Sequence, residues 1–227
     1  MLLSDFIELI YPRQCLGCGN QLLKAEKYIC LSCLNKMPKT NTHFEHDNNI
    51  IRKIAGKSEV LNASACYWFL KNSIVQNLIH NIKYKGFKNA AKEIGIIYGK
   101  ELLKSDFYNN IDIIIPVPLH ISKLRERGYN QSEYFAMGLS LSMGKKLVTN
   151  VLYRGYATET QTKKKIYDRW LNVKSNFIVK NSHLINGKHI LLVDDVITSG
   201  STLTSCSDTL FSIPETKVTI ATIASTF

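Results

Sequence analysis

The fold is decided by the stretch Leu191-Leu192-Val193-Asp194-Asp195-Val196-Ile197-Thr198-Ser199-Gly200-Ser201-Thr202. Ile190 to Val193 are apolar at successive positions, which predicts a strand that is covered on both faces in the middle of a parallel sheet. Asp194 and Asp195 follow at its carboxyl end, and two carboxylates are costly to bury unless a polar group occupies them. Ligands of open α/β sheets bind outside the carboxyl ends of the strands. The stretch therefore predicts a parallel α/β fold with a ligand site at this strand end.

The residues after the two acids suit a phosphate. Thr198-Ser199-Gly200-Ser201-Thr202 is small and rich in hydroxyls, and it leads into a helix expected over 201–211. Successive backbone N–H groups and a helix N-terminus attract an anion, and a glycine allows the backbone to approach it closely. The carboxylates of Asp194 and Asp195 accept hydrogen bonds from paired hydroxyls such as those of a ribose. A diol site beside a phosphate site predicts a phosphorylated ribose as the ligand.

The rest of the chain supports this fold class, because strand and helix patterns alternate from about Val60 onward. Strands are expected over 63–70, 111–117, 147–152, 176–179, 189–193 and 217–223, and helices over 72–84, 89–104, a segment containing Phe135, Leu139 and Met143, and 201–211. Such alternation predicts a mostly parallel sheet flanked by helices on both faces.

Composition narrows the class of protein. The 227 residues are 45% hydrophobic, as in a soluble globular protein, and carry a formal net charge of +11. This charge suits nucleic acid or a phosphorylated small molecule, although the positive residues are scattered and some soluble proteins are simply basic. No apolar run approaches the roughly 18 residues of a membrane span, and the start lacks the basic flank of a secretory signal, so we expect a cytoplasmic protein without membrane insertion. A P-loop nucleotidase is disfavoured because no Gly-x-x-x-x-Gly-Lys-[Ser/Thr] motif occurs.

Four of the six cysteines form two Cys-x-x-Cys hooks, Cys15 with Cys18 and Cys30 with Cys33. Two hooks supply four thiolates to one point, a ligand set that zinc prefers, and a four-cysteine site has no open position, which predicts a structural role. Disulfides are disfavoured in a reducing compartment, and iron–sulfur ligation is the minor alternative. His43 and His46 are expected to be solvated rather than to be ligands.

Three segments are expected along the chain. Residues 1–39 form a zinc-binding head, 40–59 a linker or hood segment, and 60–227 the α/β domain. Pro116-Val117-Pro118-Leu119-His120 ends a buried strand and runs into a basic loop over 123–131. Arg125 or Arg127 of this loop could hold a pyrophosphate, because the planar guanidinium matches phosphate oxygens, although a solvated loop is the alternative for either residue alone.

The stretch 191–202 resembles the signature of type I phosphoribosyltransferases, which bind phosphoribosyl pyrophosphate (PRPP). The order Pro-Val-Pro, then Arg125-x-Arg127-Gly-Tyr-Asn-Gln, resembles the ComF (ComFC-like, competence protein F) family. Lys83-Tyr84-Lys85-Gly86 resembles a Lys-Tyr-basic-Gly turn of that family. A further set of residues is similar to the mobile loop of that family: Thr160-Gln161-Thr162, Arg169, Asn172, Val173 and Phe177. Lys163 to Tyr167 depart from the family pattern.

The resemblance implies roles for individual residues. Asp194 and Asp195 would be the catalytic acids that hold the ribose hydroxyls, and Thr198, Ser199, Gly200, Ser201 and Thr202 would hold the 5-phosphate. Arg125, Arg127 and Lys85 are expected at the pyrophosphate, with Mg²⁺ accompanying PRPP.

The family resemblance also implies a function, which is to bind PRPP and handle single-stranded DNA in natural transformation, the uptake of DNA. Competence-machinery proteins would be partners, and no array of stacking aromatics is evident in the sequence. One alternative is an active phosphoribosyltransferase, of the glycosyltransferase class, in which a nitrogen acceptor displaces pyrophosphate from C1 of the ribose. The other is a PRPP-sensing regulator without turnover. The sequence names no acceptor, so it leaves open whether the protein is an enzyme.

Overall fold

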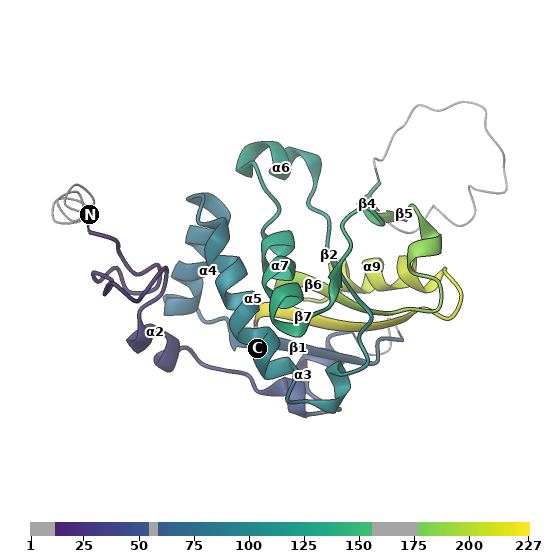
Figure 1. Cartoon of the computed structure of the whole chain (residues 1–227), viewed down its shortest axis with the longest axis horizontal. Helices are drawn as coiled ribbons and strands as arrows, with labels where there is room; N and C mark the ends of the chain where they lie inside the picture. Colours follow the sequence, from purple (N-terminus) through teal and green to yellow (C-terminus); the bar gives the residue numbers. More distant parts are fainter. Residues whose placement is uncertain (1–11, 55–58, 156–176) are drawn as a thin grey trace.

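The computed structural model describes residues 12–54, 59–155 and 177–227, and Figure 1 shows their arrangement. None of the helices in these ranges is long and apolar enough to cross a membrane. The elements, in chain order, are α2 (Leu31–Lys36), η1 (Thr42–Phe44), α3 (Asn49–Arg52), β1 (Asn62–Trp68), α4 (Ile74–Tyr84), α5 (Lys88–Leu102), η2 (Asp106–Tyr108), β2 (Ile113–Pro116), α6 (Ile121–Arg127), α7 (Gln131–Met143), β3 (Lys146–Leu147), β4 (Leu152–Arg154), β5 (Phe177–Val179), η3 (Ser182–Leu184), β6 (His189–Ile197), α9 (Ser201–Phe211) and β7 (Lys217–Ser225).

A five-stranded sheet forms the centre of the molecule, in the order β1-β7-β6-β2-β3. Every neighbouring pair in it is parallel, which confirms the predicted fold class. β6 is the middle strand, and its Leu192 pairs with Ile220 of β7 on one side and Ile115 of β2 on the other. β4 and β5 form a separate antiparallel ribbon at the stems of residues 156–176.

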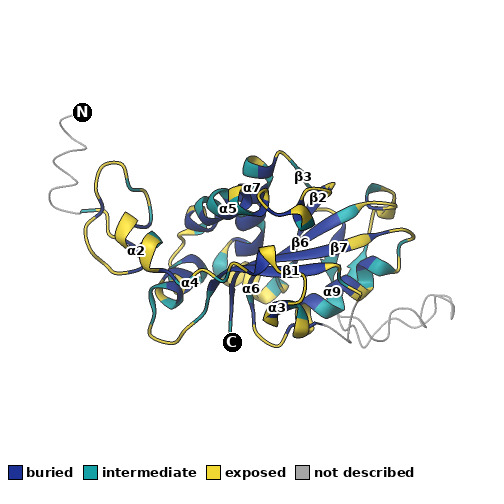
Figure 2. Ribbon diagram, turned by 90° about the horizontal axis from the view of Figure 1, so that it is seen from below, coloured by how far each residue is buried: buried dark blue, intermediate teal, exposed yellow. Residues whose placement is uncertain are grey.

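Helices cover both faces of the sheet, as Figure 2 shows by the buried strands between α5 and α7 on one side and α3 and α9 on the other. Successive residues of β6 point to opposite faces. Leu191 and Val193 belong to the apolar cluster under α4, α5 and α7, whereas Ile190 and Leu192 belong to the cluster under α3 and α9. All four are fully buried, which explains the uninterrupted apolar run in the sequence.

Two glycines allow α5 and α7 to pack backbone to backbone. A Cβ at Gly138 would lie 2.0 Å from the carbonyl oxygen of Lys92, and a Cβ at Gly95 would lie 2.3 Å from that of Phe135. Neither neighbour is a flexible side chain that could move aside. This contact sets the height at which α7 lies over the sheet, and therefore where its first turn meets β6.

Several element boundaries differ from the sequence prediction. β6 continues through both acids to Ile197, because Asp194, Val196 and Ile197 pair with Thr222, Ala224 and Ser225 of the long strand β7. The single strand predicted over 147–152 was wrong, since it divides into β3 and β4. The basic loop is in part a helix, α6, which begins at the cap His120 and ends where Gly128 takes a left-handed conformation (φ 75°).

The segment expected to be a linker is folded in residues 42–54. Ile50 and Ile54 are fully buried, and the Asn48 side chain caps α3 by accepting hydrogen bonds from the N–H groups of Ile50 and Ile51. His43 is also buried, at 3% exposure, so the expectation that it is solvated was wrong; its ring packs against Phe44 and Tyr98. Most of the loop predicted to cover the site lies outside the described residues, and Phe177 begins β5.

We predict that Gly138→Ala destabilises the fold despite the better helix propensity of alanine. The methyl group must push α5 and α7 apart, and overpacking of this kind costs about 1–3 kcal/mol or more, against a propensity gain of about 1 kcal/mol. Urea unfolding followed by circular dichroism measures the free energy of unfolding. Leu141→Ala, at a position of α7 that is 64% exposed, is the control and should change that free energy by less than about 0.5 kcal/mol. An unchanged stability in Gly138→Ala would contradict the close helix contact.

Candidate functional site

The two acids of β6 make different contacts. Asp195 is 5% exposed, and its Oδ2 forms an ion pair with Lys83 Nζ of α4 at 3.0 Å and accepts a hydrogen bond from Gln131 Nε2 of α7 at 2.6 Å. Asp194 is half-buried, and its Oδ1 accepts from Ser132 Oγ at 2.8 Å and from the backbone N–H of Asp195 at 2.8 Å. The first turn of α7 therefore contacts both acids, while only Asp195 has an ion pair.

This arrangement disfavours the charged form of the Asp194 carboxyl group. Burial, together with the neighbouring charge of Asp195, raises the pKa of Asp194 to about 7, although the hydrogen bond from Ser132 opposes the shift. A carboxyl group whose pKa lies near 7 is easily neutralised, and it gains from any ligand that donates hydrogen bonds to its charged form. Perturbed acids of this kind in a cleft are candidates for a functional site.

Residues 198–202 line a cleft at the end of β6, where the sequence predicts a phosphate site. A small cleft of about 30 Å³ is lined by Asp194 and the residues from Val196 to Leu203. Gly200, with φ 76°, precedes α9, and a Cβ there would lie 3.0 Å from the carbonyl oxygen of Lys53. No side chain caps the eleven-residue helix α9, so the N–H groups of its first turn face the cleft without a side-chain acceptor. This geometry suits an anion.

The three basic residues that are predicted at the pyrophosphate do not all lie at the carboxyl end of β6. Arg127 lies over the ring of Tyr84, 5.0 Å from its centroid, and its Nε is buried without a hydrogen-bond partner among the described residues. Arg125 is exposed on α6. Lys85 instead lines a cavity beside the cysteine head, whereas Lys83 reaches Asp195. Positions two residues apart on a helix point in different directions, which is why the choice between these two lysines could not be made from the motif alone.

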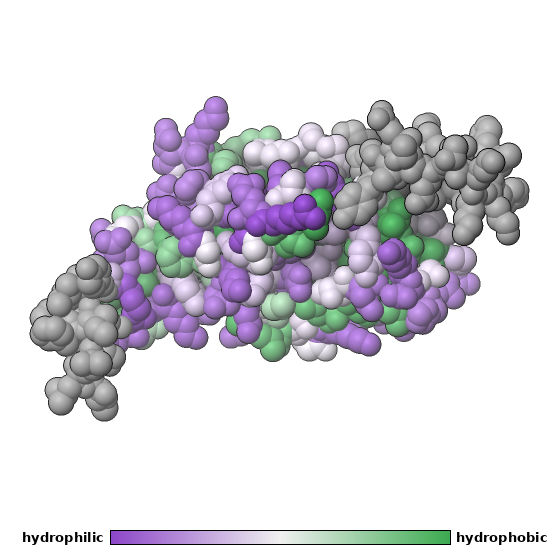
Figure 3. All heavy atoms as spheres, turned by 90° about the horizontal axis from the view of Figure 1, so that it is seen from above, coloured by the Kyte–Doolittle hydropathy of each residue, from purple (hydrophilic) through white to green (hydrophobic). Residues whose placement is uncertain are grey.

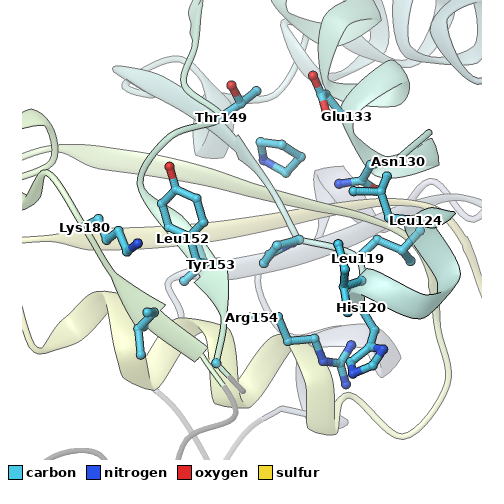
Figure 4. A pocket seen from close by; sticks show the side chains of 15 residues that line it. Leu119, His120, Leu124, Asn130, Glu133, Thr149, Leu152, Tyr153, Arg154 and Lys180 are labelled. Carbon is cyan, nitrogen blue, oxygen red and sulfur yellow. The ribbon is translucent and has the colours of Figure 1, made fainter. Parts of the chain in front are cut away.

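A larger pocket, of about 380 Å³, lies beside the acid pair (Figure 4). Its position follows from two contacts: Pro116 in its wall pairs with Val193 of β6, and Glu133 in its wall is the residue after Ser132 on α7. The other polar residues that line it come from the turn after β2, from α7 and from the β4–β5 ribbon: His120, Asn130, Thr149, Tyr153, Arg154 and Lys180. The sequence did not predict the residues of the ribbon as part of a site, because no local motif links them to β6.

The four predicted cysteines come together in space. The Sγ atoms of Cys15, Cys18, Cys30 and Cys33 all lie within 4.8 Å of one another, and none is in a disulfide. The Sγ atoms of Cys18 and Cys30 are 3.8 Å apart, close to the edge of a tetrahedron with Zn–S bonds of about 2.3 Å. Although burial opposes it, N–H donors from Cys30, Cys18 and Gly17 lower the pKa of Cys15 to about 7, which favours the thiolate that a metal needs. The cluster could therefore hold a zinc ion.

The cysteine head is anchored to α4 by its backbone. The side-chain amides of Asn77 and Asn81 donate to the carbonyl oxygens of Gly17 and Leu16, both at 2.9 Å. Cys15 and Cys33 also share an apolar cluster with buried residues of α4. The head is thus packed on the same helix that holds Asp195.

Comparison with known proteins places this chain among phosphoribosyltransferase-like sequences. Residues 130–225 match the phosphoribosyl transferase domain family. Competence protein F of Haemophilus influenzae is 36% identical over 100 residues (44% of this chain and of that protein), and DNA utilization protein YhgH of Escherichia coli O6:H1 is 29% identical over 136 residues (59% of each). Competence protein ComFC of Bacillus subtilis is 25% identical over 226 residues, which cover 86% of this chain and 87% of that protein. The chain thus spans about half the length of the first two relatives.

Solved structures of phosphoribosyl-handling proteins are also similar to the chain. Glutamine phosphoribosylpyrophosphate amidotransferase from B. subtilis aligns with a TM-score of 0.43 and 18% identity, over 60% of this chain and 26% of that one. An adenine phosphoribosyltransferase aligns with a TM-score of 0.35 and 15% identity, over 66% and 74%.

We predict that Asp194→Asn makes stability less dependent on pH. The folded protein keeps the Asp194 proton up to about pH 7, whereas the unfolded chain loses it near 3.8. The folded state therefore binds more protons between these values, and wild-type stability falls as the pH rises through this window. The variant should match wild type near about pH 4 and have the higher free energy of unfolding above about pH 7, as measured by urea unfolding across this range. A difference of constant size at every pH would contradict the raised pKa.

Proposed function

We propose that this ComF-family protein, with a type I phosphoribosyltransferase fold, binds PRPP and handles single-stranded DNA in natural transformation. The matched domain and the named relatives support the family. The PRPP site would lie at the carboxyl end of β6. The cytoplasm is the compartment that we propose for this activity, with Mg²⁺ accompanying PRPP.

One observation carries the PRPP proposal: an acid with a raised pKa lies in the same cleft as the uncapped N-terminus of α9. The 5-phosphate would accept hydrogen bonds from N–H groups of residues 199–202, which need an acceptor. Asp194 would accept hydrogen bonds from the ribose hydroxyls and so regain favourable partners for its charged form. Asp195 is already paired with Lys83 and Gln131, so its role in this proposal is to hold α4 and α7 against β6.

The pyrophosphate would then extend toward the end of α6. The buried Nε of Arg127 has no partner among the described residues, and a phosphate oxygen would supply one. Arg125 is exposed on the same helix and could move toward the ligand. Lys85 lines the cavity at the head instead, so we do not propose that it binds the pyrophosphate.

The DNA part of the proposal rests on the printed names of the relatives and on charge. Two relatives are named competence proteins and one a DNA utilization protein. The net charge of +11 suits a polyanion. Competence-machinery proteins are the partners that this function would require.

Transfer of the phosphoribosyl group is a second candidate, and the pocket in Figure 4 favours it. Its volume of about 380 Å³, next to the acid pair, would accommodate a small acceptor. In that reaction a nitrogen of the acceptor would form a bond to C1 of the ribose, pyrophosphate would leave with the bonding electrons, and the nitrogen would lose a proton. Glu133 and His120 line the pocket and could accept that proton. A screen of acceptors for Mg²⁺-dependent pyrophosphate release, with Asp194→Asn as the control, tests this candidate.

We expect Ser201→Asp to abolish PRPP binding without weakening the fold. Ser201 is the exposed first residue of α9, where a carboxylate favours the helix dipole by about 0.3–1 kcal/mol but repels a phosphate. Isothermal titration calorimetry with PRPP and Mg²⁺ should show at least a tenfold loss of affinity, or about 1.4 kcal/mol. Ser182→Asp makes the same charge change at the first residue of η3, and its affinity should equal that of wild type. Equal PRPP affinity in Ser201→Asp and wild type would place the phosphate elsewhere.

We propose that the four-cysteine cluster holds a structural zinc ion. Wild-type protein should contain about one zinc per chain by mass spectrometry of the metal, and Cys18→Ser should lose it together with thermal stability. Cys206→Ala is the matched control, because that cysteine lies on the buried face of α9 and is not part of the cluster; it should keep its zinc even if its stability falls. Iron in place of zinc, with visible absorption, would instead indicate an iron–sulfur cluster.

A further inference from the structure

A cavity of about 760 Å³ separates the cysteine head from the turn between α4 and α5. Figure 1 shows the head beside α4, and the cavity lies where the two meet. It is remote in sequence from the stretch 191–202, since among the described residues its walls come from 12–28 and 77–87. Cys15 and Cys18 of the proposed metal cluster belong to its wall, but the PRPP proposal does not use the cavity.

The walls of this cavity combine cations with aromatic rings. Arg13, Lys27 and Lys85 supply positive charge, and Tyr28 and Phe87 supply rings. The side chain of Lys27 is 70% exposed, and its nearest carboxylate oxygen, on Glu93, is 4.0 Å away. A solvated cavity with this composition suits a ligand that carries both phosphates and flat bases.

The same composition continues out of the cavity along α4. His80 in the wall lies 5.1 Å, between ring centroids, from Tyr84. Tyr84 is 57% exposed, and Arg127 lies over its ring at 5.0 Å. Arg127 belongs to the end of α6, where the pyrophosphate is proposed. Seven residues thus connect the head to the proposed PRPP site, and we name them the head-to-loop strip: Lys27, Tyr28, Phe87, Lys85, His80, Tyr84 and Arg127.

The surface around the strip is hydrophilic. Figure 3 looks onto the face that carries α6 and the α4–α5 turn, and hydrophilic side chains gather there. Two large rings nevertheless remain exposed on it, Tyr84 at 57% and Phe87 at 39%. Three acids lie near the strip: Glu26 and Glu126 are the chain neighbours of Lys27 and Arg127, and a carboxylate oxygen of Glu93 is 4.0 Å from Lys27 Nζ. The cations of the cavity wall and the strip are four, Arg13, Lys27, Lys85 and Arg127. Exposed rings interleaved with cations are the composition on which the bases of a single strand stack.

We propose that the head-to-loop strip is the binding path for single-stranded DNA. Phosphates would lie along Lys27, Lys85 and Arg127, while bases would stack on Phe87 and Tyr84. The inference rests on the proposed DNA function and assigns it to a surface. A strand on this path would end at Arg127, so the DNA and PRPP sites would meet at one residue. The packing of the head on α4 would complete the path, which gives the metal cluster a role in binding as well as in folding.

The test is fluorescence anisotropy of the zinc-loaded full chain with a labelled oligothymidine longer than about 16 nucleotides, titrated at several salt concentrations. Lys27→Ala/Lys85→Ala should bind about tenfold more weakly at low salt. It should also reduce the slope of log affinity against log salt by about 1.4, since each phosphate contact on a single strand contributes about 0.7. Lys188→Ala/Lys217→Ala removes the same charge from exposed lysines at the amino ends of β6 and β7 and should leave both values unchanged.

A second pair of variants separates stacking from charge. Tyr84→Ala should weaken binding about fivefold or more with an unchanged salt slope, because a stacked base contributes about 1–3 kcal/mol by alanine substitution. Tyr84→Phe keeps the ring and should bind as wild type does. Tyr84 is exposed, so neither change removes a core contact.

The outcomes distinguish a wrong location of the DNA path from a failure of the proposed DNA function. If wild type binds and the strip variants bind as tightly as their controls, the strip is not the path, and the proposed DNA function still stands. If both lysine pairs lose affinity equally, binding depends only on net charge, which also overturns the strip. If wild type shows no salt-dependent binding of the oligothymidine, the proposed DNA function fails and the strip fails with it.

Discussion

The buried ion pair between Lys83 and Asp195 is the contact on which the arrangement of the site depends. A carboxylate that is 5% exposed is costly unless it is paired and hydrogen-bonded, and Lys83 and Gln131 supply both. Because the three residues belong to α4, α7 and β6, satisfying one charge ties two helices to the end of the central strand. Asp194 is left beside this pair with a raised pKa and an open cleft. One acid therefore organises the site, and its neighbour is free to meet a ligand.

Helix α4 connects the two ends of the molecule through its different faces. Its buried face packs on the sheet, and Lys83 reaches the acid from it. Asn77 and Asn81 hold the cysteine head by its backbone carbonyls. His80 and Tyr84 lie toward the surface that leads to Arg127. One helix therefore contacts both the cysteine head and Asp195 of the proposed ligand site.

The position of α7 also determines how the side chains of the site are arranged. Its glycine contact with α5 fixes its height, and its first turn then presents Gln131 to Asp195, Ser132 to Asp194 and Glu133 to the pocket beside β2. Three consecutive residues thus serve three neighbouring parts of the site. This is possible because a helix terminus splays successive side chains around its axis, and it makes the site sensitive to packing some distance from it.

The sequence by itself determined the central strand, the parallel fold class, the turn that leads from that strand into α9 and the four-cysteine cluster. Each of these depends on residues that are neighbours in the chain, such as Ile190 to Val193 or the paired Cys-x-x-Cys hooks, so a local pattern is enough to predict them. Only the tertiary structure decided that Lys83 pairs with Asp195 while Lys85 lines the cavity at the head, that residues 42–54 are packed, and that the β4–β5 ribbon completes a pocket. The head-to-loop strip could not be predicted from the sequence for the same reason. Tyr28 shares a cavity wall with His80, and Arg127 lies over Tyr84, only because separate segments pack together, and no spacing along the chain records which side chains will share a surface.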